Sequence, residues 1–465
     1  MIRSMWCAAA LAAVGASLPA YAQDAELGRI REEIRQLREA YENRIQALEK
    51  RLAETEARAG NVESSASQPA VQASSRPAGE NALNPALSVI LNGTYANLSR
   101  NPDTYRINGF VPTLGEVGPP KRGLSLGESE LTFSANVDHL FRGTLIASIT
   151  PENEIEVEEA YIQTLGLGRG FTVKAGRFLS SVGYQNEIHA HAWDFTDAPL
   201  ANKVFLGNQL AEDGVQIKWV APTELYFDAG IELGRGRKFP GGPDGGRSKN
   251  GFGSGNLFAH LGGDMGTGTA WRVGVSHLRT SPQDRGYDDF DSTGAAVSNS
   301  FTGRTRLWVL DGILKWAPNL NPTYTNFKLQ GEYFRRTENG ILTYDTQNAS
   351  LGAQTDSYAS RQSGWYLQGV YQFIPQWRVG LRYDRLNSGR TSIGLADSGA
   401  LAATDFPILA GYNPKRSTLM LDWSASEFSR LRLQFARDYS RMGEPDNQVF
   451  LQYIMSLGAH GAHKF

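Results

Sequence analysis

Apolar and polar residues alternate through most of the C-terminal three-quarters of the chain. In residues 419–425 every second residue is Leu, Trp or Ala, and Met, Asp and Ser stand between them. In residues 430–435 Arg or Gln alternates with Leu or Phe. Because successive side chains of a β-strand point to opposite faces, one face of each segment suits lipid and the other suits water. The pattern predicts strands of a membrane barrel, with a soluble β-sandwich as the alternative.

Sixteen segments show this period when residues 86–457 are divided at turn signals. They are 86–97, 124–137, 141–150, 155–165, 171–180, 214–220, 224–234, 256–265, 269–279, 304–317, 322–336, 361–374, 376–388, 416–426, 428–440 and 447–457. The connections near 138, 167, 222, 267, 319, 375 and 427 are tight, whereas most of the others are long. We therefore predict an all-β fold, a transmembrane antiparallel β-barrel of about sixteen strands with its tight turns in the periplasm.

The N-terminal residues have the pattern of a secretory signal peptide. Arg3 precedes an apolar stretch, and the small residues Ala20 and Ala22 provide a cleavage site, so residues 1–22 are the predicted signal. The single cysteine, Cys7, lies within it, which excludes disulfides and thiol catalysis from the mature chain. No later apolar run approaches the roughly 20 residues of a membrane helix, so a spanning structure has to be a closed barrel.

Two further segments precede the predicted barrel. Residues 23–59 carry apolar residues at coiled-coil spacing, with a four-residue step before the last three: Leu27, Ile30, Ile34, Leu37, Tyr41, Ile45, Leu48 and Leu52. We predict a periplasmic α-helical coiled coil that self-associates, with an isolated amphipathic helix as the alternative. Residues 60–85 are rich in Ser, Ala and Pro and are predicted to be a flexible linker, followed by the barrel at 86–465.

The motifs VEEAYIQ at 157–163 and FTVKAGRF at 171–178 resemble those of phosphate-selective outer-membrane porins. The order of signal, coiled coil, linker and barrel is also similar to that of TonB-independent siderophore porins with an N-terminal coiled coil. The resemblance implies a homotrimer and a loop after the second motif that folds into the pore. Residues 23–85 are too few and too polar for the plug of a TonB-dependent receptor.

Strand parity indicates which charged residues face the lumen. The candidate pore-lining residues are Glu128, Glu130, Arg142, Lys174, Lys218, Arg378, Arg382, Arg430 and Arg432. Acidic residues gather on the early strands and basic residues on the late ones, which predicts a transverse field in the pore. Mutual neutralisation across neighbouring strands is the alternative. Because the lumen is not one-sidedly basic, the charge pattern argues against phosphate selectivity.

Residues 181–213 form an unusually apolar and aromatic connection, so we predict that this loop packs inside the barrel and narrows it. His189 and His191 stand two residues apart with acidic residues nearby, a mixture suited to zinc or copper. Histidines that hydrogen-bond loop backbone are the alternative, and no cofactor is expected.

The composition adds few constraints. The chain is 41% hydrophobic with a formal charge of -2, which argues against a nucleic-acid partner. No histidine adjoins a nucleophile motif, so an enzyme is not expected. The terminal Phe465 is the expected signal for the barrel-insertion machinery.

The sequence thus predicts a bacterial outer-membrane channel in contact with lipid and lipopolysaccharide, with its N-terminal segment in the periplasm. It would pass small solutes or ions by diffusion. A TonB-independent uptake channel for a metal or siderophore and a structural envelope tether remain alternatives.

Overall fold

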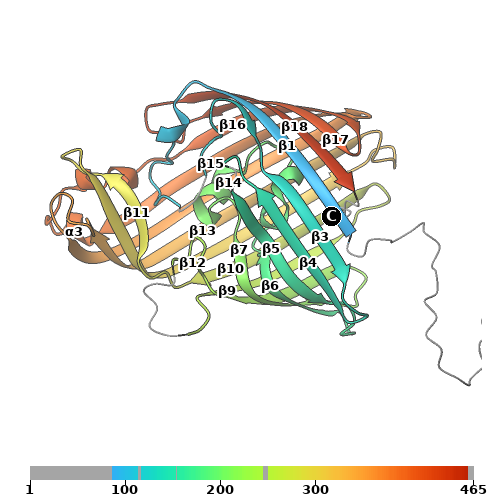
Figure 1. The fold of residues 1–465 in the computed structure, drawn as a ribbon, viewed down its shortest axis with the longest axis horizontal. Coiled ribbons are helices and arrows are strands. Elements are labelled where there is room, and N and C mark those ends of the chain that lie inside the picture. Colours follow the sequence, from blue (N-terminus) through green and yellow to red (C-terminus); the bar gives the residue numbers. More distant parts are fainter. Residues whose placement is uncertain (1–85, 114–116, 153, 244–249, 459–465) are drawn as a thin grey trace, which may run out of the picture. The chain divides into compact units, whose positions relative to one another are not determined.

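The barrel is a single antiparallel sheet that closes on itself. The computed structural model describes residues 86–113, 117–152, 154–243 and 250–458. Strand β1 (Ala86–Leu98) pairs along its length with β18 (Asp446–Gly458) and completes the ring (Figure 1). The predicted signal peptide, coiled coil and linker lie outside the described residues, as does Phe465.

The eighteen strand segments of the sheet make sixteen barrel strands, as predicted. Strands β2 (Gly123–Leu126) and β3 (Ser129–Asn136) pair with successive parts of β1 and share one place in the wall. Strand β11 (Arg285–Phe290) pairs with β12 and extends a loop beyond the wall. The remaining strands are β4 (Phe141–Ile149), β5 (Ile155–Thr164), β6 (Phe171–Leu179), β7 (Ala211–Val220), β8 (Tyr226–Gly234), β9 (Ser254–Asp264), β10 (Thr269–Thr280), β12 (Ala296–Trp316), β13 (Asn326–Tyr344), β14 (Gln354–Ile374), β15 (Trp377–Ile393), β16 (Lys415–Ser426) and β17 (Ser429–Asp438).

Several strands run further toward the long loops than the hydrophobic pattern predicts. Strand β14 begins at residue 354 instead of 361, and β13 continues to residue 344 instead of 336. The extra residues are mostly polar on both faces, so the alternation weakens although the backbone pairing continues. Pairing with a neighbour, rather than contact with lipid, determines where these strands end.

The alternation of burial confirms the predicted faces. In β16 the outward residues Leu419, Leu421 and Trp423 are exposed, whereas Met420 and Asp422 are fully buried. The described residues contain no helix of the length and apolarity that crossing a membrane requires.

Aromatic side chains gather on the outer surface near the tight turns. Phe171 packs beside Trp219 with ring centroids 6.4 Å apart, and Trp377 beside Trp423 at 6.3 Å. Trp316, the last residue of β12, is also exposed and lies close to a tight turn. Such rings are typical of the interface between a bilayer and water.

Short helices lie in the long connections rather than in the wall. They are η1 (Pro102–Thr104), η2 (Gln185–Glu187), η3 (Ala190–Ala192), α2 (Leu200–Leu206), α3 (Gly394–Asp397), η5 (Ala403–Asp405) and η6 (Pro407–Leu409). Two apolar clusters include side chains from these connections and from inward positions of β12 to β15. An apolar core thus fills part of a lumen whose wall is otherwise largely polar.

Gly176 in β6 has a backbone that only glycine adopts without strain. Its φ is +128°, and an added Cβ would overlap the carbonyl oxygen of Ala160 on β5. We expect Gly176→Ala to destabilise the barrel by more than about 1 kcal/mol. Thermal unfolding of the detergent-solubilised protein measures this loss. Gly93→Ala is the matched control, since its added Cβ meets nothing within 4 Å; an equal loss in both variants would contradict the explanation.

Candidate functional site

The connection between β6 and β7 occupies the interior of the barrel. It spans residues 180–210, since the predicted last three residues of the loop, 211–213, belong to β7. All seven residues of α2 are buried. Phe205 stacks on Phe334 of β13 at 5.7 Å and meets Phe110 edge-on at 6.0 Å. We name residues 180–210 the inner loop.

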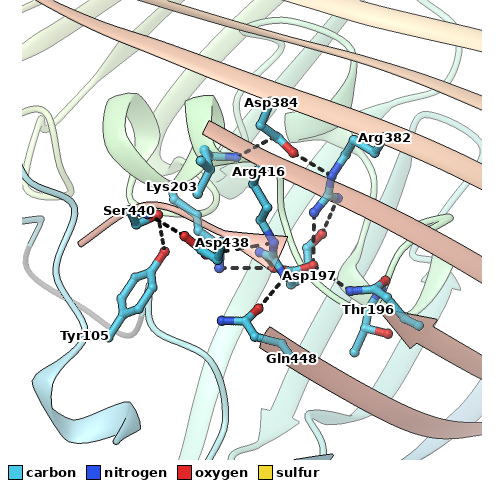
Figure 2. A network of polar contacts seen from close by, with 12 residues as sticks. Tyr105, Thr196, Asp197, Lys203, Arg382, Asp384, Arg416, Asp438, Ser440 and Gln448 are labelled. Carbon is cyan, nitrogen blue, oxygen red and sulfur yellow. Dashed lines mark hydrogen bonds and ion pairs between the residues drawn. The ribbon is translucent and has the colours of Figure 1, made fainter. Parts of the chain in front are cut away.

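Asp197 of the inner loop is the centre of a buried ion-pair network (Figure 2). One carboxylate oxygen accepts from Arg382 of β15 at 3.0 Å, and the other pairs with Arg416 of β16 and lies 3.2 Å from Lys203 Nζ. The Arg382 guanidinium also donates to the backbone oxygen of Asp197 at 2.7 Å. Asp384 accepts from the amide of Leu200 at 2.9 Å and so fixes the start of α2.

The charges around Asp197 determine its ionisation. Burial raises the pKa of a carboxyl group, but the positive charges of Arg416, Lys203 and Arg382 outweigh burial and hold the pKa of Asp197 well below its ordinary value. Asp197 is therefore a charged anchor of the inner loop at neutral pH.

The same wall holds the loop at a second point. Asp194 pairs with Lys328 of β13 and with Arg378 of β15. Arg432 of β17 donates to the backbone oxygen of Trp193 at 2.9 Å, and Arg430 donates to that of His191. The late-strand arginines thus bind the inner loop instead of facing open water.

The opposite side of the inner loop carries histidines that face the acidic early strands. The ring nitrogens of His189 lie 3.0 Å from Glu158 and 3.1 Å from Glu159, both on β5. His191 Nδ1 lies 2.7 Å from Glu130 on β3. Burial lowers the pKa of His189, but its hydrogen bonds to the two glutamates outweigh burial and hold that pKa well above its ordinary value. The inner loop therefore presents the carboxylates of Asp194 and Asp197 to the late strands β13 and β15–β17, which we name the basic wall. It presents imidazole rings to the early strands β3 and β5, which we name the acidic wall.

A β-bulge at Glu158 brings two consecutive glutamates to this cluster. Ile146 on β4 pairs with Glu159, whereas the next residue, Ala147, pairs with Val157, so Glu158 is the extra residue. Strict alternation would have turned Glu159 toward lipid. For that reason the sequence analysis did not predict Glu159 as a lumen-facing residue. A bulge re-aims side chains in this way, and bulges are frequent beside functional sites.

A cavity of about 2610 Å³ is bordered by the inner loop, the early strands and residues of the long connections after β8, β15 and β17. The early-strand side contributes Glu128, Glu154, Glu156 and Glu158, and the inner loop contributes Trp193, Thr196, Asp197 and Lys203. Residues 105–108 and 110–113 of the first long connection line it as well, as do the basic residues Lys121, Arg122 and Arg177. The acidic wall thus borders open space, whereas the basic wall is covered by the inner loop.

Of the nine candidate pore-lining residues, only Glu128 borders this cavity in the described part of the chain. Glu130, Arg378, Arg382, Arg430 and Arg432 contact the inner loop. Lys174 lies over the ring of Tyr161 at 4.5 Å.

The other two candidates bind neighbouring strands. Lys218 is 3.6 Å from Asp228, and Arg142 donates to Ser134 at 2.8 Å. Sequence reasoning named the two histidines and the lumen-facing glutamates separately, and the structure brings them together. It missed Glu159, Lys203 and Arg416 as members of the site.

Comparison with known proteins gives one clear relationship. No protein-family model matches the chain. An uncharacterized protein of Aquifex aeolicus (strain VF5) is 31% identical over 370 residues, which is 74% of this chain and 71% of that protein. The chain belongs to the family of this Aquifex protein.

Solved structures similar to this member of the Aquifex family are outer-membrane proteins. A loop L8 deletion mutant of OmpT of Vibrio cholerae has a TM-score of 0.48 at 10% identity, covering 80% of this chain and 99% of the other. The anion-selective porin of Comamonas acidovorans has a TM-score of 0.46 at 11% identity, covering 80% and 99%. The outer-membrane channel DcaP of Acinetobacter baumannii has a TM-score of 0.44 at 12% identity, covering 80% and 97%.

Proposed function

We propose that the protein is an outer-membrane channel for passive diffusion of small hydrophilic solutes and ions, with a preference for cations. The observation that carries the proposal is the cavity between the inner loop and the acidic early strands, within a closed barrel whose outer face is apolar. A cation passing there meets the carboxylates of Glu154, Glu156 and Glu158 on one side, and carboxylates that line a pore favour cation passage.

The same geometry argues against phosphate as the preferred solute. The arginines that would bind an anion, Arg378, Arg382 and Arg432, already bind carboxylate or backbone oxygens of the inner loop. Guanidinium groups bind phosphate through the same donors that these contacts use. The basic wall therefore serves to position the inner loop.

The assembly remains a proposal that rests on sequence. The heptad spacing in residues 23–59 supports a coiled coil below the membrane, and we propose a homotrimer on that basis. Contact with lipid and lipopolysaccharide, and insertion through Phe465, are proposed with it. A structural tether through the same coiled coil would leave the charged cavity without a role.

A TonB-independent uptake channel for a metal ion is the second candidate, and one observation favours it. Glu130, Glu158 and His189 place their donor atoms together at the edge of the cavity. Sieving of bulk solutes needs no such cluster.

Single-channel recording in a planar bilayer tests the proposal. We expect steady conductance, in three equal steps for a trimer, and a reversal potential under a salt gradient that indicates cation preference. A folded protein that conducts nothing would contradict a diffusion channel.

The double variant Glu154→Gln/Glu156→Gln tests the origin of that preference. Both side chains line the cavity, so their neutralisation should move the reversal potential toward zero while the conductance persists. Glu224→Gln, in the turn between β7 and β8, is the control and should change neither quantity. An unchanged reversal potential in the double variant would assign ion preference to another part of the channel.

A further inference from the structure

Three donor atoms of different chemistry meet where the inner loop touches the early strands. A ring nitrogen of His189 and one carboxylate oxygen each of Glu130 and Glu158 all lie within 4.8 Å of one another. His189 Nδ1 is 3.0 Å from the Glu158 oxygen and 3.7 Å from the Glu130 oxygen. A zinc ion binds such donors at about 2.0–2.2 Å, so small side-chain rotations would bring all three into its coordination sphere, with the ion replacing the proton on His189 Nδ1.

The surrounding hydrogen bonds orient these donors as those of metal sites do. His189 Nε2 faces Glu159 at 3.1 Å, which leaves Nδ1 directed at the other two carboxylates. His191 Nδ1 holds the second oxygen of Glu130 at 2.7 Å. Metal-binding histidines almost always donate their other ring N–H to such a partner, which fixes the ring.

The cluster is rich in carboxyl groups. Four of them, Glu128, Glu130, Glu158 and Glu159, surround the rings of His189 and His191, with Lys174 near Glu159. The carboxyl groups of Glu128 and Glu158 are in hydrogen-bonding contact. Like charges this close repel each other unless a proton or a cation lies between them.

We infer that Glu130, Glu158 and His189 bind one divalent transition-metal ion of the zinc class, with Glu159 and His191 as positioning residues. An imidazole ligand favours zinc, nickel or copper, because calcium and magnesium prefer oxygen ligands alone. Glu158 borders the cavity, so a fourth position is open to water or to an exchanging ligand. A role in transport rests on the proposed channel, but binding itself does not.

Calorimetric titration of the full-length, tag-free protein with ZnCl₂ in detergent tests the inference. His460 and His463, outside the described residues, are replaced by alanine so that they bind no zinc. We expect one zinc per chain, with at least about tenfold weaker binding in Glu158→Gln, in His189→Gln and in the positioning variant Glu159→Gln. His277→Ala is the matched control, because the ring of His277 packs against the exposed Trp308 with ring centroids 4.2 Å apart. Zinc binding by this variant should be unchanged.

X-ray absorption of the zinc-loaded protein with unaltered ligands is a readout that does not require the variants to fold. One nitrogen and at least two oxygen donors are expected in the coordination sphere. Absence of zinc binding, retention of full affinity in His189→Gln, or calcium binding as tight as zinc would each overturn the inference. Conductance recorded on the same samples separates the two proposals: zinc binding without conductance rejects only the channel, and conductance without zinc binding rejects only the metal site.

Discussion

Replacing Asp197 by asparagine should release the inner loop from the basic wall and increase the single-channel conductance. The substitution keeps the size of the side chain but removes the charge that three buried cations share. Breaking a buried ion pair by removing one partner typically costs about 3–5 kcal/mol, because the remaining charge stays buried without compensation. We expect a larger and noisier conductance, together with cleavage of the loop by added protease.

Asp213→Asn is the matched control for Asp197→Asn. Asp213 also pairs with an arginine, Arg177, but the two side chains are 36% and 35% exposed. An ion pair that exposed contributes about 0–1 kcal/mol, so conductance and protease resistance should remain those of the wild type. Equal behaviour of the two variants would show that the buried network does not hold the inner loop.

The pH dependence of the Asp197→Asn effect follows from the depressed pKa of Asp197. A carboxyl group whose pKa is lowered in the folded state stabilises the fold at every pH above its pKa in the unfolded chain. That contribution is lost only as the pH falls below the unfolded-state pKa toward the folded-state pKa. The difference in thermal stability between the wild type and Asp197→Asn should therefore persist from pH 7 down to about pH 4, near the ordinary aspartate pKa. A difference that vanished at pH 5 would contradict the assignment.

Replacing Phe205 by alanine should loosen the same loop through its apolar contacts. Phe205 is fully buried between Phe110 and Phe334, and truncation of such a side chain costs about 3–5 kcal/mol. We expect a lower unfolding temperature and protease cleavage near α2. Phe205→Leu should retain most of the stability, because leucine fills much of the space.

Phe252→Ala is the control for Phe205→Ala. Phe252 lies in another long connection and is 65% exposed, so its truncation leaves no cavity. If Phe205→Ala behaved like Phe252→Ala, the ion pairs alone would hold the inner loop. A clear difference would show that the apolar core inside the lumen contributes independently.

Strand number and facing were accessible from the sequence because lipid imposes a simple rule on each strand. Leu419 and Asp422 are placed correctly by parity alone, since one must meet lipid and the other must not. The partners within the lumen follow no such local rule. Asp197 and Arg416 are 219 residues apart, and nothing near either residue specifies the other. The loop's apolar character predicted that it packs inside the barrel, but not which wall it covers.

Strand parity also assigned side chains to the wrong face where the backbone departs from regular pairing. Glu158 and Glu159 face the same cluster because a bulge inserts one residue, and consecutive glutamates give no sign of it. The sequence analysis also predicted one strand at 124–137 and missed the break at Gly127 and Glu128 between β2 and β3, because the pairing with β1 is irregular there. Irregular pairing lies beside the candidate site in both cases.

The inner loop also has a mechanical consequence. Its contacts join β3 and β5 on one side of the ring to β15, β16 and β17 on another, through charged groups at both ends. A barrel wall without such a connection can flatten when lateral pressure in the membrane changes, because each strand pair bends easily about its long axis. A cross-member of fixed length resists that deformation. The bore of this barrel should therefore remain constant when the surrounding lipid is compressed or thinned.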